Sequence, residues 1–134
     1  MDYKLEVIPI PVTDIDRAKQ FYAERMGFVV DLDTMIGEDH RLVQLTPVGS
    51  GCSIHLNQKM AGPPAGSLQG LQLVVDDIEA AHADLAGRGV DAGPVQHIEG
   101  GEWIDGKGGP WNSFVFFKDP DGNGWVLQER PGAE

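Results

Sequence analysis

A histidine and three acidic residues gather in and just before a glycine-rich stretch, Gly100–Gly109. These residues are His97, Glu99, Glu102 and Asp105. Imidazole and carboxylate groups are metal ligands, and they also transfer protons as general acids and bases. The stretch therefore has two interpretations. It could hold a metal ion or an acid–base pair, or it could be a solvated loop that closes over a ligand.

His55 is a second candidate for chemistry. It lies between Ile54 and Leu56, and the period-two alternation of a strand turns it to the face opposite these apolar neighbours. A metal-free enzyme would use His55 together with His97 or Glu102 for proton transfer. We assign no catalytic residue, and these three are the candidates that the sequence offers.

The same alternation predicts a ligand-binding wall, because a few polar side chains recur among apolar ones. The expected wall residues are His55, Gln72, Phe114, Phe116, Val126 and Gln128. Trp103 and Trp111 accompany the glycine-rich stretch, and we expect them to close over the wall and stack on a planar ligand. The alternatives are that this face is solvated or a subunit contact, and that the tryptophans pin the loop or fill a dimer contact.

The elements that would position these residues follow a repeated pattern. Ile8–Ala18 and Leu71–Ala81 each read as an apolar strand, an acidic turn and an amphipathic helix, with a glycine near the helix end and further strands beyond. The order βαβββ, met twice, predicts an α+β fold. We expect an open, curved eight-stranded mixed sheet with helices on its outer face.

The expected strands can be placed along the chain. They are Lys4–Val12, Phe28–Asp33, Arg41–Thr46, Cys52–Asn57, Leu71–Val75, Val95–Ile98, Ser113–Phe117 and Gly124–Glu129. The linker Gly62–Ser67 divides a single domain, 1–134, into modules of about residues 1–60 and 68–134. The groove between two such modules is a natural ligand site.

Composition restricts the partners and the compartment. The chain has 21 acidic and 10 basic residues, a net charge of -11, which argues against nucleic acid. The same charge would favour a cationic ligand, or it serves solubility alone. No apolar run approaches the ~20 residues of a membrane span, so no membrane partner is expected. The single cysteine, Cys52, fits a reducing compartment, and we predict a cytoplasmic protein.

Two segments carry a resemblance to a known family. Val12–Phe28 (VTDIDRAKQFYAERMGF) and the Asp119–Asn123 turn (DPDGN) before the final strand resemble the vicinal oxygen chelate superfamily. That superfamily includes glyoxalase I, extradiol dioxygenases, fosfomycin-resistance enzymes and bleomycin-resistance proteins. The resemblance implies paired βαβββ modules, an open eight-stranded cup and a homodimer with sites between modules.

The resemblance also implies where a metal would bind. The catalytic members hold a divalent metal on side chains at four strand positions, which correspond here to Val7, His55, Gly70 and Val126. Only His55 carries a donor atom, whereas a tight site needs three or four donors. We therefore expect no metal at this position and no cofactor.

Two functions remain open from the sequence. The first is a metal-independent small-molecule-binding protein that sequesters a planar or cationic compound, like the drug-sequestering members of the superfamily. The alternative is a lyase, isomerase or dioxygenase whose metal site is shifted or lost. The missing donors favour binding over catalysis, and they do not name the ligand.

Overall fold

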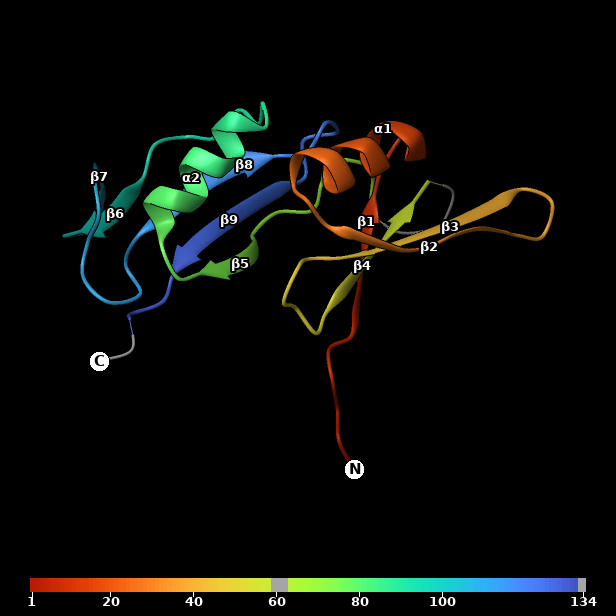
Figure 1. Ribbon diagram of the computed structural model, residues 1–134, viewed down its shortest axis with the longest axis horizontal. Helices are drawn as coiled ribbons and strands as arrows, with labels where there is room; N and C mark the ends of the chain where they lie inside the picture. The colour runs from red at the N-terminus through yellow and green to blue at the C-terminus, as the bar shows by residue number, and fades with distance from the viewer. Residues whose placement is uncertain (59–62, 133–134) are drawn as a thin grey trace. The chain divides into compact units, whose positions relative to one another are not determined.

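The computed structural model describes residues 1–58 and 63–132, which fall into two compact units (Figure 1). The first unit comprises the described residues of Met1–Leu68 together with Asp119–Asn123. The second comprises those of Gln69–Lys118 and Gly124–Glu134. Gly62, where the predicted linker begins, and residue 60, where the first predicted module ends, lie outside the described residues.

The first unit has the predicted order of elements. Its elements are β1 (Val7–Pro11), α1 (Ile15–Gln20), the π-helical segment η1 (Phe21–Arg25), β2 (Val29–Ile36), β3 (His40–Thr46) and β4 (Ser53–Asn57). The strand order is β1-β4-β3-β2, in which β1 and β4 are parallel and the other neighbours antiparallel. Asp14 caps α1, because its carboxylate accepts a hydrogen bond of 3.1 Å from the Arg17 backbone N–H.

The two faces of this sheet differ in polarity. Alternate residues of the central strands are apolar and buried, together with residues of the helical segments. The strand residues are Val43, Leu45, Ile54 and Leu56, and the helical residues are Ala18 and Tyr22. The intervening residues, among them Gln44 and His55, lie on the other face. The edge strand β2 exposes large apolar side chains along its length, an edge of the kind that a second chain can cover. The expected homodimer stays a prediction.

The second unit contains one more strand. Its elements are β5 (Leu71–Val75), α2 (Ile78–Gly87), β6 (Gln96–Glu99), β7 (Glu102–Asp105), β8 (Phe114–Lys118) and β9 (Gly124–Glu129), in the sheet order β5-β9-β8-β6-β7. Trp125 and Leu127 are buried, and Leu71 and Leu73 are less exposed than their neighbour Gln72. β5 therefore alternates as predicted, although Leu71 and Leu73 are half-buried rather than buried. In β9 Val126 is buried as well as its neighbours Trp125 and Leu127, so burial does not alternate along that strand.

The α+β class is confirmed, but the strand count is wrong. The described residues form nine strands in two separate sheets, of four and five strands, instead of eight in one. The additional strand, β7, lies in the glycine-rich stretch, where the sequence analysis predicts no strand. Gly100 and Gly101 have φ angles of 59° and 81°, so they form the two-residue turn with positive φ that favours a hairpin between β6 and β7.

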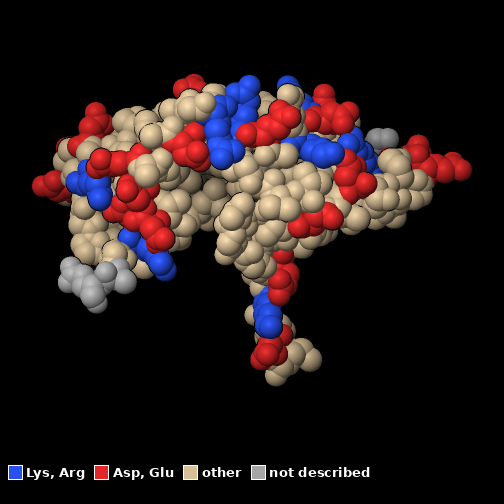
Figure 2. Space-filling model, in the orientation of Figure 1, with Lys and Arg blue, Asp and Glu red and all other residues tan. Residues whose placement is uncertain are grey.

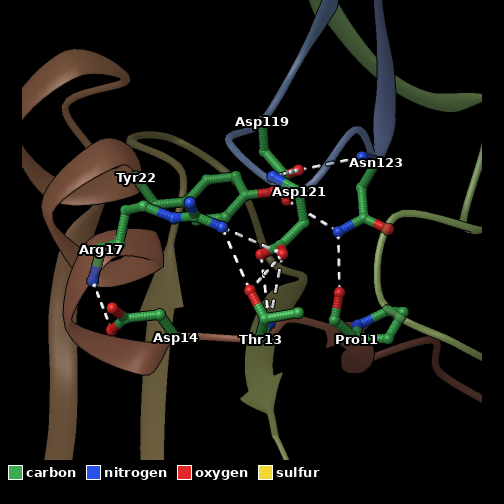
Figure 3. A network of polar contacts seen from close by, with 8 residues as sticks. All are labelled: Pro11, Thr13, Asp14, Arg17, Tyr22, Asp119, Asp121 and Asn123. Atoms are coloured by element: carbon green, nitrogen blue, oxygen red, sulfur yellow. Dashed lines mark hydrogen bonds and ion pairs between the residues drawn. The ribbon is translucent and has the colours of Figure 1, made fainter.

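The turn between β8 and β9 belongs to the first unit, where it makes a dense polar network (Figure 3). The carboxylate of Asp119, only 5 % exposed, accepts four hydrogen bonds. The donors are the Tyr22 hydroxyl (2.7 Å), the Asn123 side-chain amide (2.8 Å) and the backbone N–H groups of Asp121 and Asn123 (2.9 Å each). The Asn123 amide also donates to the Pro11 carbonyl at 2.9 Å.

The same turn reaches the start of α1 through Asp121. Its carboxylate accepts from the backbone N–H and the hydroxyl of Thr13 and pairs with Arg17 at 3.1 Å. On the other side of the turn, Gly66 has φ of +81°, and a Cβ there would lie 2.1 Å from the Asp121 carbonyl oxygen. Only glycine fits this position. The turn therefore joins β1, the α1 start and residues 63–68.

Charged side chains cover the helices of both units. In Figure 2 acidic and basic side chains lie intermixed over α1 and α2. Over the described part of the chain, no helix has the length and hydropathy of a bilayer-crossing segment.

Candidate functional site

One face of the second sheet brings together most of the predicted wall. In the strand register Phe116 lies opposite Val126, and Val126 lies opposite Gln72. Two residues farther along the same strands, Phe114 lies opposite Gln128. Residues that are directly opposite point to the same side of a sheet. These five residues and Trp103 define what we call the aromatic face.

Trp103 completes an aromatic cluster on this face. Its ring centroid lies 5.5 Å from that of Phe114 and 5.2 Å from that of Phe116, with interplanar angles of 87° and 90°. This is the edge-to-face arrangement that aromatic rings prefer. Trp103 is 48 % exposed and Phe116 is 40 % exposed, so the cluster presents apolar surface to solvent. From the sequence we predict this residue for the site without assigning it to a strand, whereas it lies on β7.

Two of the predicted wall residues contribute differently from expectation. Val126 is 7 % exposed, so it offers little surface to a ligand. The side-chain amide of Gln128 donates a hydrogen bond of 2.9 Å to the Trp111 carbonyl. This polar group of the predicted wall is therefore engaged within the protein, where it holds the loop that carries Trp111.

Trp111 sits in a conformation that is uncommon for a side-chain-bearing residue. Its φ is +61°, in the left-handed region, and its side chain is 50 % exposed. The next residue, Asn112, fixes the loop against β6: its side chain accepts from the Ile98 N–H and donates to the Ile98 carbonyl, both at 2.9 Å. Because this backbone conformation costs a side-chain-bearing residue free energy, the anchored loop has to hold Trp111 in place.

His55 lies in the first unit and joins a polar chain there. We use the name polar chain for His55, Gln44, Ser53, Thr46 and Asp31. The Nε2 atom of His55 lies 2.8 Å from the Gln44 side-chain oxygen. That His55 shares one ligand wall with the aromatic face stays a prediction.

The acidic group around His97 is tied into the hairpin. His97 Nδ1 lies 2.8 Å from the Gly106 carbonyl, and Nε2 lies 3.2 Å from the Glu99 carboxylate. Both partners accept hydrogen bonds only, so the protonated ring satisfies both. The Gly106 carbonyl, followed by Glu99, raises the pKa of His97 above its ordinary value. Glu102 lies opposite Glu99 in the β6–β7 register rather than beside His97.

This geometry predicts a pH-dependent contribution of His97 to stability. Because its pKa is higher in the folded protein than in the unfolded chain, the stabilisation is complete below about pH 6.5 and is lost as the pH rises through the folded-state pKa. The variant His97→Gln should therefore lose more unfolding free energy, relative to the wild type, at about pH 5.5 than at about pH 9. Urea unfolding at both pH values measures this. The control is His82→Gln on α2, and an equal loss for His97→Gln at both pH values would contradict the interpretation.

A metal centre does not assemble from the residues that the structure describes. Within residues 1–58 and 63–132, no three His, Cys, Asp or Glu side chains are grouped so that they could hold a metal ion. Of the four positions implied by the resemblance, Val7, Gly70 and Val126 carry no donor atom.

A cavity of about 410 Å³ lies elsewhere in the first unit. It is lined by Thr13, Asp14, Ile15, Asp16, Asp39, His40, Arg41 and Gln58, which include none of the predicted ligand-binding residues. Its cation is already paired: Arg41 contacts Asp33 at 2.8 Å and Asp16 at 2.6 Å. Hydrogen bonds from Arg41 and then Lys19 hold the pKa of Asp33 well below its usual range. Arg41 is therefore engaged in ion pairs within the first unit.

Known proteins resemble this chain over nearly its whole length. TnmS3, an antibiotic binding protein from Streptomyces sp. CB03234, is 35 % identical, with a TM-score of 0.78, covering 96 % of this chain and 97 % of its own. A glyoxalase/bleomycin resistance protein from the same organism is 36 % identical, with a TM-score of 0.74, covering 93 % and 99 %. YetH from Bacillus subtilis (strain 168) is 27 % identical over 130 residues, 94 % of this chain and 98 % of its own.

The family match agrees with the paired modules and the DPDGN turn described above. It extends over residues 4–127, which include most of each unit. The chain belongs to the Glyoxalase/Bleomycin resistance protein/Dioxygenase superfamily.

Proposed function

We propose that this protein binds a planar aromatic small molecule on the aromatic face of its second unit, without a metal ion. The observation that carries the proposal is the exposed cluster of Trp103, Phe114 and Phe116. An aromatic cluster that a folded chain leaves open to solvent marks a binding surface. A planar ligand would stack on it and gain about 1 kcal/mol per ring beyond the area buried.

The similarity to TnmS3 supports a binding role. That protein is described as antibiotic binding, and the likeness extends through both chains at 35 % identity. The net charge of -11 supports a preference for cationic over anionic aromatics, because an anion would be repelled. Metal independence rests on the donor count at the four positions, where His55 stands alone.

Calorimetric titration tests the proposal directly. Acridine orange, a planar cation, and 2-naphthol, a neutral planar compound, should bind the purified protein with the same affinity before and after treatment with EDTA. Elemental analysis of the same sample accompanies the titration. The finding of about one metal ion per chain, lost in His55→Ala together with binding, would refute metal independence and restore the enzyme alternative.

A further inference from the structure

The polar chain of the first unit is continuous from His55 to a carboxylate. His55 Nε2 lies 2.8 Å from Gln44 Oε1, and Gln44 Nε2 lies 3.5 Å from Ser53 Oγ and 3.4 Å from Asp31 Oδ2. Ser53 Oγ lies 2.7 Å from Thr46 Oγ1, which bonds the Asp31 carboxylate. All five side chains lie on the sheet face opposite the buried apolar residues of β3 and β4.

A β-bulge positions the Asp31 carboxylate, which lies at one end of the polar chain. The register of β2 and β3 shifts between Val30 and Leu32, so Asp31 is the extra residue. In a regular strand Asp31 and Asp33, two residues apart, would point to the same face. Here Asp31 bonds Thr46 and Gln44 on one face, whereas Asp33 bonds Arg41 and Lys19 of α1 on the other.

The carboxylate fixes the direction of every hydrogen bond in the chain. An ionised carboxylate only accepts, so the Thr46 hydroxyl donates to Asp31. The Thr46 oxygen then accepts from the Ser53 hydroxyl, whose proton is thereby used.

The Gln44 side-chain amide extends the same ordering of donors and acceptors to the His55 imidazole. With its proton used, the Ser53 oxygen can only accept, and Gln44 must turn its NH₂ group toward Ser53 and Asp31. The Gln44 carbonyl oxygen therefore faces His55 and accepts from Nε2–H.

We propose that the polar chain holds neutral His55 in the Nε2–H tautomer and that its Nδ1 lone pair is a binding site for a neutral hydrogen-bond donor, such as the hydroxyl of a phenol. Gln44, Ser53, Thr46 and Asp31 are positioning residues that act through His55. An ether or a carbonyl oxygen, which only accepts, would leave Nδ1 unpaired. The proposal does not depend on ligand binding at the aromatic face.

Nitrogen NMR of the free protein tests the tautomer. At a pH where the imidazole is neutral, His55 should show a protonated Nε2 and an unprotonated Nδ1 without a second tautomer. Gln44→Leu should release the ring into a mixture of tautomers, and Asp31→Asn, whose amide can donate, should do so partly. The matched controls are Gln58→Leu and Asp39→Asn, at exposed positions of the same unit. A protonated Nδ1 in the wild type would overturn the proposal.

A pair of probes tests the ligand class. 2-Naphthol should shift the His55 Nδ1 resonance and bind about five- to tenfold more tightly, by this resonance, than 2-methoxynaphthalene, which cannot donate. Gln44→Leu should reduce this preference while amide spectra show an intact fold, and Gln58→Leu should keep it. Equal affinities for the two compounds, or no shift of His55 with either, would overturn the assignment. Because His55 itself is observed, binding at the aromatic face alone is told apart from binding here.

Discussion

Replacing Asp119 by alanine should lower the free energy of unfolding by about 3–5 kcal/mol, since each buried donor left without a partner costs about 1–3 kcal/mol. The substitution removes the acceptor of four hydrogen bonds. Two of the donors, the Tyr22 hydroxyl and the Asn123 amide, belong to residues that are fully buried and cannot turn to water. Urea unfolding followed by circular dichroism measures the change.

The matched control for this substitution is Asp91→Ala, which removes the same carboxylate from an exposed position. It should change the unfolding free energy by less than about 0.5 kcal/mol. Tyr22→Phe keeps the ring packing and removes one of the four bonds, so it should cost about 1–2 kcal/mol. A cost for Asp119→Ala no larger than that for Asp91→Ala would show that the turn does not stabilise the first unit.

Replacing Trp103 by alanine should weaken the binding of a planar aromatic probe at the aromatic face by tenfold or more, because a lost stack together with its buried area exceeds about 1.4 kcal/mol. Phe116→Ala should have an effect of similar size, since its ring is the nearer of the two that contact Trp103. Calorimetric titration with acridine orange measures both. Because Trp103 is half exposed, its removal should change the unfolding free energy much less than it changes the affinity.

Tyr3→Ala provides the matched control, because Tyr3 is an exposed aromatic residue of the first unit, ahead of β1. It should leave the affinity unchanged. Trp111→Ala tests how far the binding surface extends. A loss of affinity in this variant would show that the loop held by Gln128 belongs to the binding surface. If Trp103→Ala and Phe116→Ala both bind the probe as the wild type does, the ligand occupies another part of the molecule.

Much of the fold could be predicted because its strands alternate strongly. Leu71–Val75 and Gly124–Glu129 have the predicted bounds, and the predicted faces of Phe114, Phe116 and Gln72 follow from that alternation. Period-two patterning is a local property, so it can be read from one segment at a time. The repeated strand, turn and helix gave the order of elements for the same reason.

What the sequence did not predict depends on contacts between distant segments. The bulge at Asp31 is visible only in the pairing of β2 with β3, and the hydrogen bond from Gln128 to Trp111 depends on where the loop returns. The β6–β7 hairpin is different, because Gly100 and Gly101 between two acidic residues are a local signal for a two-residue hairpin turn. This turn could therefore be predicted from the sequence.

The place of the Asp119–Asn123 turn in the first unit has a consequence for how the chain is made. A ribosome synthesises residues 1–68 before it adds residues 119–123, yet the buried Tyr22 hydroxyl donates a hydrogen bond to Asp119 in that later segment. The first unit therefore completes its folding after most of the second has been translated, and its contacts of long sequence separation slow that step. We therefore expect a nascent chain stalled before residue 119 to carry an incomplete first unit that chaperones and proteases recognise.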